Sequence, residues 1–184
     1  MESGINLKNK PSTNGFWLVP GMIAILLLAC AQVQRDESPS VNFNRVTFLS
    51  GWSQSGTVQL TNGRYEEATA PGSASKIVVE LSDNIAYGKL NGKDAAAAVL
   101  VTNSGGSGTF YDLALLIKDK QRWVNKDIAS LGDRVTVHAV VIKENRILVD
   151  LTAHGPEDPM CCPTRRMEYV FAVQVDTGTM KLFK

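Results

Sequence analysis

The chain has 184 residues, of which 44% are hydrophobic and 20% are charged, and its 19 basic side chains nearly cancel its 18 acidic ones. This length is sufficient for one domain with a single core. A chain without a basic excess lacks the charge needed to neutralise phosphates, so we expect no nucleic-acid partner.

An apolar segment near the start, residues 16–30, reads FWLVPGMIAILLLAC. It follows Lys8 and Lys10, and small Ala29 precedes Cys30, a pattern that is typical of a secretory signal peptide. The apolar stretch is shorter than the roughly 20 residues that a helix needs to cross a bilayer. The alternatives are an uncleaved membrane anchor and a buried helix. We expect a signal peptide that is removed by cleavage before Cys30.

Residues 27–30, Leu-Leu-Ala-Cys, resemble the lipobox of bacterial lipoproteins. The resemblance implies a diacylglycerol on the Cys30 thiol and a further acyl chain, of the palmitate type, on the new amino terminus. Two or three such chains hold a domain on a bilayer almost permanently. Ala31 follows the cysteine, and the absence of Asp there resembles the signal for the outer membrane in bacteria with two membranes. In a single-membrane host, the protein would lie on the outer face of the cell membrane.

Removal of residues 1–29 leaves 17 basic and 17 acidic side chains. No basic cluster flanks Cys30, so the linear sequence does not predict electrostatic attraction to anionic lipid near the anchor. Residues 31–42, AQVQRDESPSVN, are polar and have the composition of a tether. We expect a signal peptide over 1–29, the lipidated cysteine and tether over 30–45, and a β-rich extracytoplasmic domain over 46–184.

Short β-branched runs separated by Gly, Asn and Asp fill the rest of the chain, which predicts a mostly β, antiparallel domain. Helical turns are expected at 50–54 and 125–131. The expected strands are residues 46–49, 57–60, 77–81, 96–101, 110–117, 135–141, 147–151, 169–175 and 180–183.

The clearest hairpin joins residues 134–142 to residues 146–151 through a turn at 143–145. Strict alternation places the side chains of the first strand, Val135, Val137, Ala139 and Val141, on one face. In the second strand, alternation predicts a shared face for Ile147, Val149 and Leu151.

Five short motifs follow one another along the chain: PGSAS at 71–75, AYGKLNG at 86–92, GGSGTFY at 105–111, LGDRV at 131–135 and GPEDPMCCPT at 155–164. Together they resemble a domain of uncharacterised secreted bacterial proteins, over about residues 56–169. The resemblance implies an envelope location and supplies no activity. Relatives often carry an Asp-rich loop where this chain has GKLNGKD at 88–94. Lysines stand where a calcium cage would need carboxylates, so we expect no calcium there.

Cys161 and Cys162 are adjacent and belong to a chain expected in an oxidising compartment. We expect a vicinal disulfide, and two free, packed thiols are an alternative. A further alternative is a metal site in which both thiolates join His154, because this set suits Cu(I) or Zn²⁺. A redox-active dithiol is also open, although the usual C-x-x-C spacing is absent. No cofactor is predicted.

No catalytic residue is predicted. Ser107 lies in GGSGT, which departs from the G-x-S-x-G elbow at its last position and is followed by a strand. Nothing in the sequence arranges it with His138 or His154. Candidates for a paired general acid and base are Asp112, Asp133, Asp150 and Asp158. Candidates for a sugar- or peptide-binding face are the aromatic residues Trp52, Trp123, Tyr65 and Tyr111.

The sequence therefore predicts a lipid-anchored envelope protein that acts as a non-catalytic, ligand- or protein-binding module. The alternative is a metal-binding or redox-active protein that uses Cys161, Cys162 and His154. The expected partners are the membrane, through the lipid on Cys30, and an envelope protein or small ligand.

Overall fold

The computed structural model describes residues 41–174 and 176–183. The expected signal peptide, Cys30 and residues 31–40 of the expected tether lie outside this part of the chain. Within the described residues, no helix is both long and apolar enough to cross a membrane.

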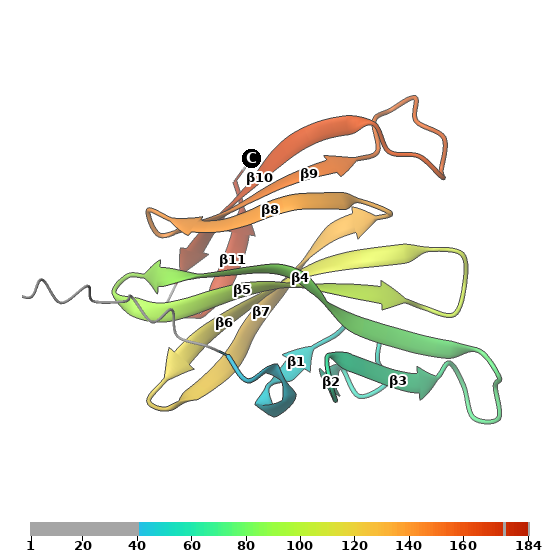
Figure 1. The fold of residues 1–184 in the computed structure, drawn as a ribbon, viewed down its shortest axis with the longest axis horizontal. Coiled ribbons are helices and arrows are strands. Elements are labelled where there is room, and N and C mark those ends of the chain that lie inside the picture. Colours follow the sequence, from blue (N-terminus) through green and yellow to red (C-terminus); the bar gives the residue numbers. More distant parts are fainter. Residues whose placement is uncertain (1–40, 175, 184) are drawn as a thin grey trace, which may run out of the picture. The chain divides into compact units, whose positions relative to one another are not determined.

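The domain is mostly β, and all its strand pairs are antiparallel, as the sequence predicts. The strands are divided among three sheets, a division that the pattern of strands alone does not specify (Figure 1). A short 3-10 helix, η1 (Phe43–Arg45), precedes a two-stranded sheet of β1 (Thr47–Leu49) and β2 (Thr57–Gln59). The five-stranded sheet contains, in spatial order, β3 (Arg64–Ala68), β4 (Lys76–Leu90), β5 (Lys93–Asn103), β6 (Thr109–Asp119) and β7 (Arg122–Asp133). The four-stranded sheet contains β8 (Thr136–Lys143), β9 (Arg146–Ala153), β10 (Arg165–Gln174) and β11 (Thr179–Leu182). Each strand lies beside the next one in the chain, so β8 and β11 form the two edges.

The five-stranded sheet is the middle layer and buries both of its faces (Figure 1). Between it and the four-stranded sheet lies a core that includes Val99, Leu113, Leu115, Ile147, Leu151 and Phe171. Its other face packs on the β1–β2 hairpin through a second core that includes Phe48, Val58, Leu60, Val79, Leu100 and Leu116.

The alanine run at 95–98 forms the centre of β5, which confirms the expected strand. Ala95 and Ala97 belong to one core and Ala96 and Ala98 to the other, and all four are fully buried. Because both faces of this strand are covered, its sequence is continuously apolar and does not alternate.

Residues 125–131, expected as a helical turn, instead form part of β7, so that prediction is wrong. The β6–β7 register shifts twice, once beside Asn125, and these irregularities break the period of two that marks a strand in sequence. Residues 50–54, also expected as a helical turn, form bends and a turn without a helix.

The expected face of the first hairpin strand holds for Val135 and Val137 and is wrong for Ala139 and Val141. A β-bulge between Val137 and Ala139 shifts the alternation in β8. Val140 and Ile142 consequently pack against the core, and Val141 is 46% exposed. In the partner strand β9, alternation holds, and Ile147, Val149 and Leu151 are fully buried as expected.

Strand β3 was not expected, because its sequence RYEEA is charged. It forms an edge of the five-stranded sheet, where charged side chains remain in water and discourage pairing with other chains. Strand β4 runs well beyond the expected residues 77–81, through a register shift between Leu81 and Ile85.

Val41 and Phe43 pack against the second core, and Val41 is only 9% exposed. The folded part of the chain therefore includes residues that the sequence predicts as part of the tether over 30–45.

Candidate functional site

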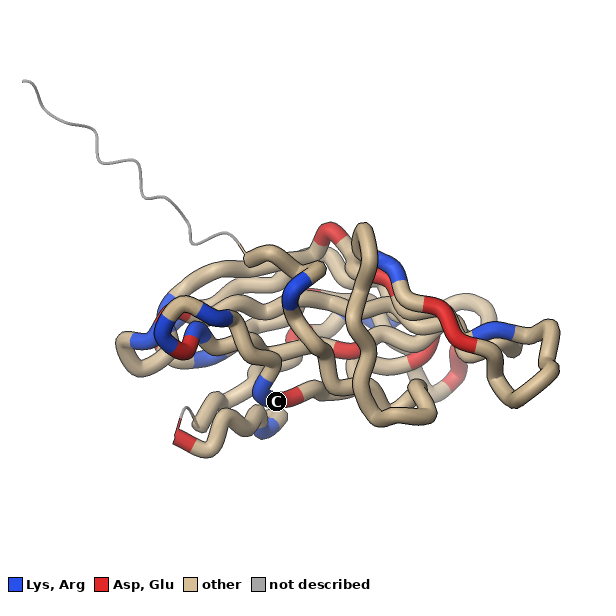
Figure 2. The backbone as a smooth tube through the Cα atoms, turned by 90° about the horizontal axis from the view of Figure 1, so that it is seen from below, with Lys and Arg blue, Asp and Glu red and all other residues tan. Residues whose placement is uncertain are grey.

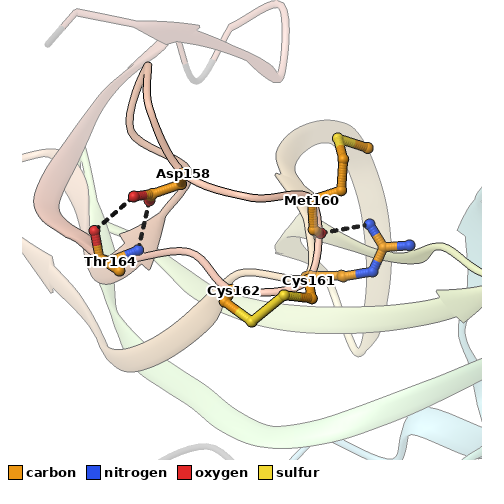
Figure 3. Close-up of a disulfide and its surroundings, with 6 residues drawn as sticks. Asp158, Met160, Cys161, Cys162 and Thr164 are labelled. Carbon is orange, nitrogen blue, oxygen red and sulfur yellow. Dashed lines mark hydrogen bonds between the residues drawn. A yellow bond between two sulfur atoms is a disulfide. The ribbon is translucent and has the colours of Figure 1, made fainter.

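The segment GPEDPMCCPT forms the loop between β9 and β10 (Figure 3). We call residues 154–164 the disulfide loop, because Cys161 and Cys162 are bonded to one another within it. The Cα atoms of the two cysteines are 3.8 Å apart, and none of the described peptide bonds is cis. The expected vicinal disulfide is therefore present.

Asp158 holds the two ends of the disulfide loop together. Its Oδ2 accepts hydrogen bonds from the backbone N–H groups of Gly155 and Thr164, both at 2.7 Å, and its Oδ1 accepts the Thr164 hydroxyl at 2.8 Å. The bonds from the Gly155 amide, the Thr164 hydroxyl and the Thr164 amide lower the pKa of the Asp158 carboxyl, and nearby His154 adds to the effect.

Arg134 holds the tip of the disulfide loop from a distant part of the chain. Its Nη1 donates to the carbonyl of Met160 at 3.0 Å, and its Nη2 donates to the carbonyl of Ser107 at 2.7 Å. The guanidinium also pairs with the Asp133 carboxylate at 2.5 Å. One side chain thus joins the β5–β6 loop, the connection between β7 and β8, and the disulfide loop.

The backbone at Arg134 is shaped for this role. Its φ of 52° lies in the left-handed region, which most residues avoid. Its N–H donates to the carbonyl of Thr109 at 2.6 Å, and Asp133 Oδ1 accepts the Thr109 N–H at 2.9 Å. The sharp change of direction between the two sheets therefore directs the guanidinium toward the loop.

The tip of the disulfide loop is apolar and exposed. Met160 is 74% exposed, and both cysteines are also exposed. Phe183 is similarly exposed at 76%, but Arg146 lies over its ring at 5.8 Å. Met160 is therefore a single exposed apolar side chain on a loop whose backbone is held by hydrogen bonds.

His154 lies at the start of the loop. Among the described residues, no group of three His, Cys, Asp or Glu side chains is placed to hold a metal ion, so the alternative site of His154 with the two cysteines is not formed. Both sulfur atoms are engaged in the disulfide. The His154 Nε2 is buried and has no hydrogen-bond partner within this same part of the chain.

The residues considered for hydrolysis lie apart from one another in the hydrogen-bond network. His138 contacts the Thr152 hydroxyl at 2.8 Å. Across residues 41–174 and 176–183, no hydrogen bond joins Ser107 to a histidine; its carbonyl instead accepts from Arg134. Asp150 pairs with Arg166, which lowers the pKa of that carboxyl.

Asp112 is the one buried acid among these candidates, at 8% exposure. Burial raises the pKa of its carboxyl, and hydrogen bonds from Trp52 and Ser130 act in the opposite direction. Trp52 Nε1 donates to Asp112 Oδ2 at 3.1 Å, and its ring stacks on Phe110 with a centroid distance of 4.1 Å. This arrangement anchors Trp52 within the domain.

The other aromatic candidates are half-buried. Tyr65 and Trp123 pack against the second core, and Tyr111 packs against the first. The segment considered for calcium forms the β4–β5 hairpin, whose turn contains Asn91 and Gly92. Its only acid, Asp94, pairs with Lys89 at 2.7 Å.

Sequence reasoning identified the disulfide loop through its adjacent cysteines but missed Arg134. No local signal marks this residue, because its bond to Met160 crosses 26 positions of sequence. Comparison with protein-family models, curated proteins and solved structures found no match.

Proposed function

We propose that the chain is a lipid-anchored protein of the bacterial envelope, attached through Cys30, whose β domain is a non-catalytic binding module. The disulfide loop is its contact surface, and the partner is an envelope protein or a small ligand with an apolar face. The observation that carries this proposal is the combination of an exposed Met160 with bracing by Arg134 and Asp158.

Bracing matters because association loses the conformational entropy of every group that becomes ordered. A loop that is already held in shape loses less, so a small apolar tip contributes more to affinity. The vicinal disulfide further restricts the backbone beside Met160. It encloses almost no chain, however, so we expect its contribution to global stability to be small.

Site-specific photo-crosslinking in intact cells tests the contact surface. A diazirine amino acid replaces Met160 in the full chain, and a matched control carries it in place of exposed Ala74 in the β3–β4 loop. We expect a discrete adduct from position 160 that is absent from position 74. Adducts of equal yield from both positions would contradict the proposal.

Two further variants separate the bracing from the disulfide. Arg134→Gln removes the charged donor to Met160 and is expected to reduce the adduct severalfold while the domain remains folded by circular dichroism. Cys161→Ser/Cys162→Ser leaves Arg134 and Asp158 in place, so capture is expected to persist.

The alternative function is redox chemistry at the Cys161–Cys162 disulfide. The exposure of the disulfide favours it, because thiol exchange requires access to a sulfur atom. Rapid alkylation in cells reports the redox state of the pair. A mixed population that changes with the growth conditions, together with loss of capture in the double serine variant, would make this alternative the better description.

Intact mass measurement on the membrane-extracted protein tests the anchor. The expected mass is that of residues 30–184 with acyl chains and two hydrogens fewer than the reduced form. A mass that includes residues 1–29 and lacks acyl chains would rule out the lipoprotein proposal.

A further inference from the structure

A cationic pocket lies where the described chain begins. It has a volume of about 640 Å³ and is lined by Asn42, Arg45, Lys118, Gln121, Arg122 and Trp123. Among the described residues, no carboxylate contributes to the lining. The side chains come from η1 and from the β6–β7 hairpin, so residues more than 70 positions apart in sequence form one site.

The hairpin register explains part of this arrangement. Lys118 and Trp123 are direct partners across β6 and β7, and the Lys118 ammonium lies 6.0 Å from the Trp123 ring centroid. Lys118 also lies 3.7 Å from a carboxylate oxygen of Asp94, but that acid pairs more closely with Lys89. Asp119 stands opposite Arg122 in the register without a salt bridge to it.

Arg45 and Arg122 are the free charges of the pocket. Both are exposed, and neither forms a salt bridge within the described residues. Guanidinium groups bind phosphate through paired hydrogen bonds, and an indole ring is suited to the boundary between water and lipid. The lining therefore has the chemistry of a site for a phosphate ester.

The surroundings of the pocket extend its positive charge. A neighbouring hollow shares Lys118 and is lined by Lys93 and Lys126, together with Asp119 and Asp176. Figure 2 shows several basic positions near the end of the domain that contains these hairpin turns, with acidic positions among them. The linear sequence shows no basic cluster near Cys30, but the fold gathers basic side chains from separate segments at this end of the domain.

The position of the pocket in the chain points to its ligand. Asn42 is twelve positions after Cys30, and chain geometry limits the span between them to about 40 Å whatever the conformation. A ligand in the anchoring bilayer would therefore be presented at a high effective concentration, so that even weak contacts would be occupied.

From these observations we propose that the cationic pocket binds the phosphate groups of anionic phospholipids in the leaflet that holds the acyl chains. This proposal rests on the proposed lipid anchor, which brings the domain to a bilayer. Binding would orient the domain with this end toward the membrane. Attraction between a basic surface and anionic lipid is screened over about 10 Å at 0.1 M salt, so binding should weaken as salt rises.

The test uses the acylated full-length product in vesicles of phosphatidylcholine alone or with 30% phosphatidylglycerol. Lipids brominated near the headgroup quench the fluorescence of nearby tryptophan, and subtraction of the Trp123→Phe variant isolates the Trp123 signal. We expect roughly twofold stronger quenching with phosphatidylglycerol at 0.1 M salt, and no difference at 1 M salt.

Two double variants locate the effect. Arg45→Gln/Arg122→Gln is expected to abolish the dependence on phosphatidylglycerol. Arg165→Gln/Arg166→Gln removes the same charge from the start of β10 and is expected to preserve it. Equal quenching in both kinds of vesicle, or equal loss in both double variants, would overturn the proposal.

Two controls distinguish a lipid headgroup from a soluble phosphate ester, and the pocket from the anchor. If glycerol phosphate at 1 mM changes Trp123 emission without vesicles, and phosphatidylglycerol in vesicles causes no quenching beyond that of phosphatidylcholine, the pocket binds a soluble phosphate ester and the membrane proposal is wrong. Intact mass reports acylation independently. If the protein is acylated but shows no lipid-dependent quenching, the pocket proposal is wrong and the anchor proposal stands. If the chain is not acylated but is quenched only with phosphatidylglycerol, the pocket proposal is supported and the anchor proposal is wrong.

Discussion

At the scale of single residues, Asp158 and Arg134 cross-link the disulfide loop: Asp158 joins its two ends, and Arg134 joins its tip to the β5–β6 loop. Each uses a charged side chain to satisfy two or more groups on segments that would otherwise be independent. The Asp158 bonds are charge-assisted on the acceptor side, so they depend on the ionised carboxylate.

This dependence predicts a pH effect confined to the loop. The pKa of Asp158 is lowered in the folded state, so its contribution to loop order is complete above the ordinary value of 3.8 and is lost as the pH falls through the folded value. We expect the hydrogen-exchange protection of the Gly155 and Thr164 amides to decrease below pH 3.8, relative to amides in β5.

The Asp158→Asn variant is the control for this prediction. It keeps an acceptor oxygen but removes the charge, so the two amides should be less protected at neutral pH and should show little further change in acid. An unchanged pH profile in Asp158→Asn would show that another group controls the loop.

At the scale of elements, Asn125 joins β1 to the middle sheet. Its Oδ1 accepts the Leu49 N–H at 2.7 Å, and its Nδ2 donates to the carbonyls of Leu115 and Asp127, both at 2.8 Å. The side chain thereby satisfies backbone groups beside an irregularity in the β6–β7 register.

Replacement of Asn125 by leucine leaves these backbone groups without partners in a buried place. We expect Asn125→Leu to lower the free energy of unfolding by about 3 kcal/mol, measured by urea denaturation. Asn44→Leu, at an exposed position in η1, is the matched control and should change the free energy by less than about 0.5 kcal/mol. Similar effects of the two changes would show that the Asn125 bonds do not stabilise the domain.

A close approach between β4 and β8 also constrains these elements. A Cβ atom at Gly88 would lie 2.9 Å from the Cβ and Cγ2 atoms of Ile142. Because Ile142 packs against the core, only glycine allows the strands to approach this closely at that point.

At the scale of the whole molecule, two cores share one middle sheet, so the domain depends on the layer formed by its first described residues. Val41 is buried, and Phe43 stacks near Phe48 at a centroid distance of 6.3 Å. These residues cover apolar surface that would otherwise meet water.

A comparison of two fragments tests this boundary. Residues 46–184 lack the side chains of Val41 and Phe43, so we expect this fragment to be less stable than residues 41–184 by about 2 kcal/mol. Phe43→Ala in the longer fragment should cause part of the same loss. Identical thermal unfolding of the two fragments would show that residues 41–45 do not stabilise the domain and belong to the tether.

Much of the local structure could be predicted because it depends on neighbours in sequence. Alternation marked β9, the turn at residues 143–145 marked the β8–β9 hairpin, and the alanine run with its β-branched continuation marked β5. Failures occurred where the register is irregular, at Asn125 in β7 and beside His138 in β8, because one extra residue reverses which side chains face the core.

The sequence by itself determined an antiparallel β domain, the place of its main hairpin and a pair of adjacent cysteines. The tertiary structure decided that Arg134 braces Met160, that Asp112 is buried beside Trp52, and that Arg45 joins Arg122 in one cationic pocket. The physical reason is the range of the interactions involved. Backbone preference and side-chain alternation act over a few residues, whereas these contacts depend on strand register and on which layers pack together.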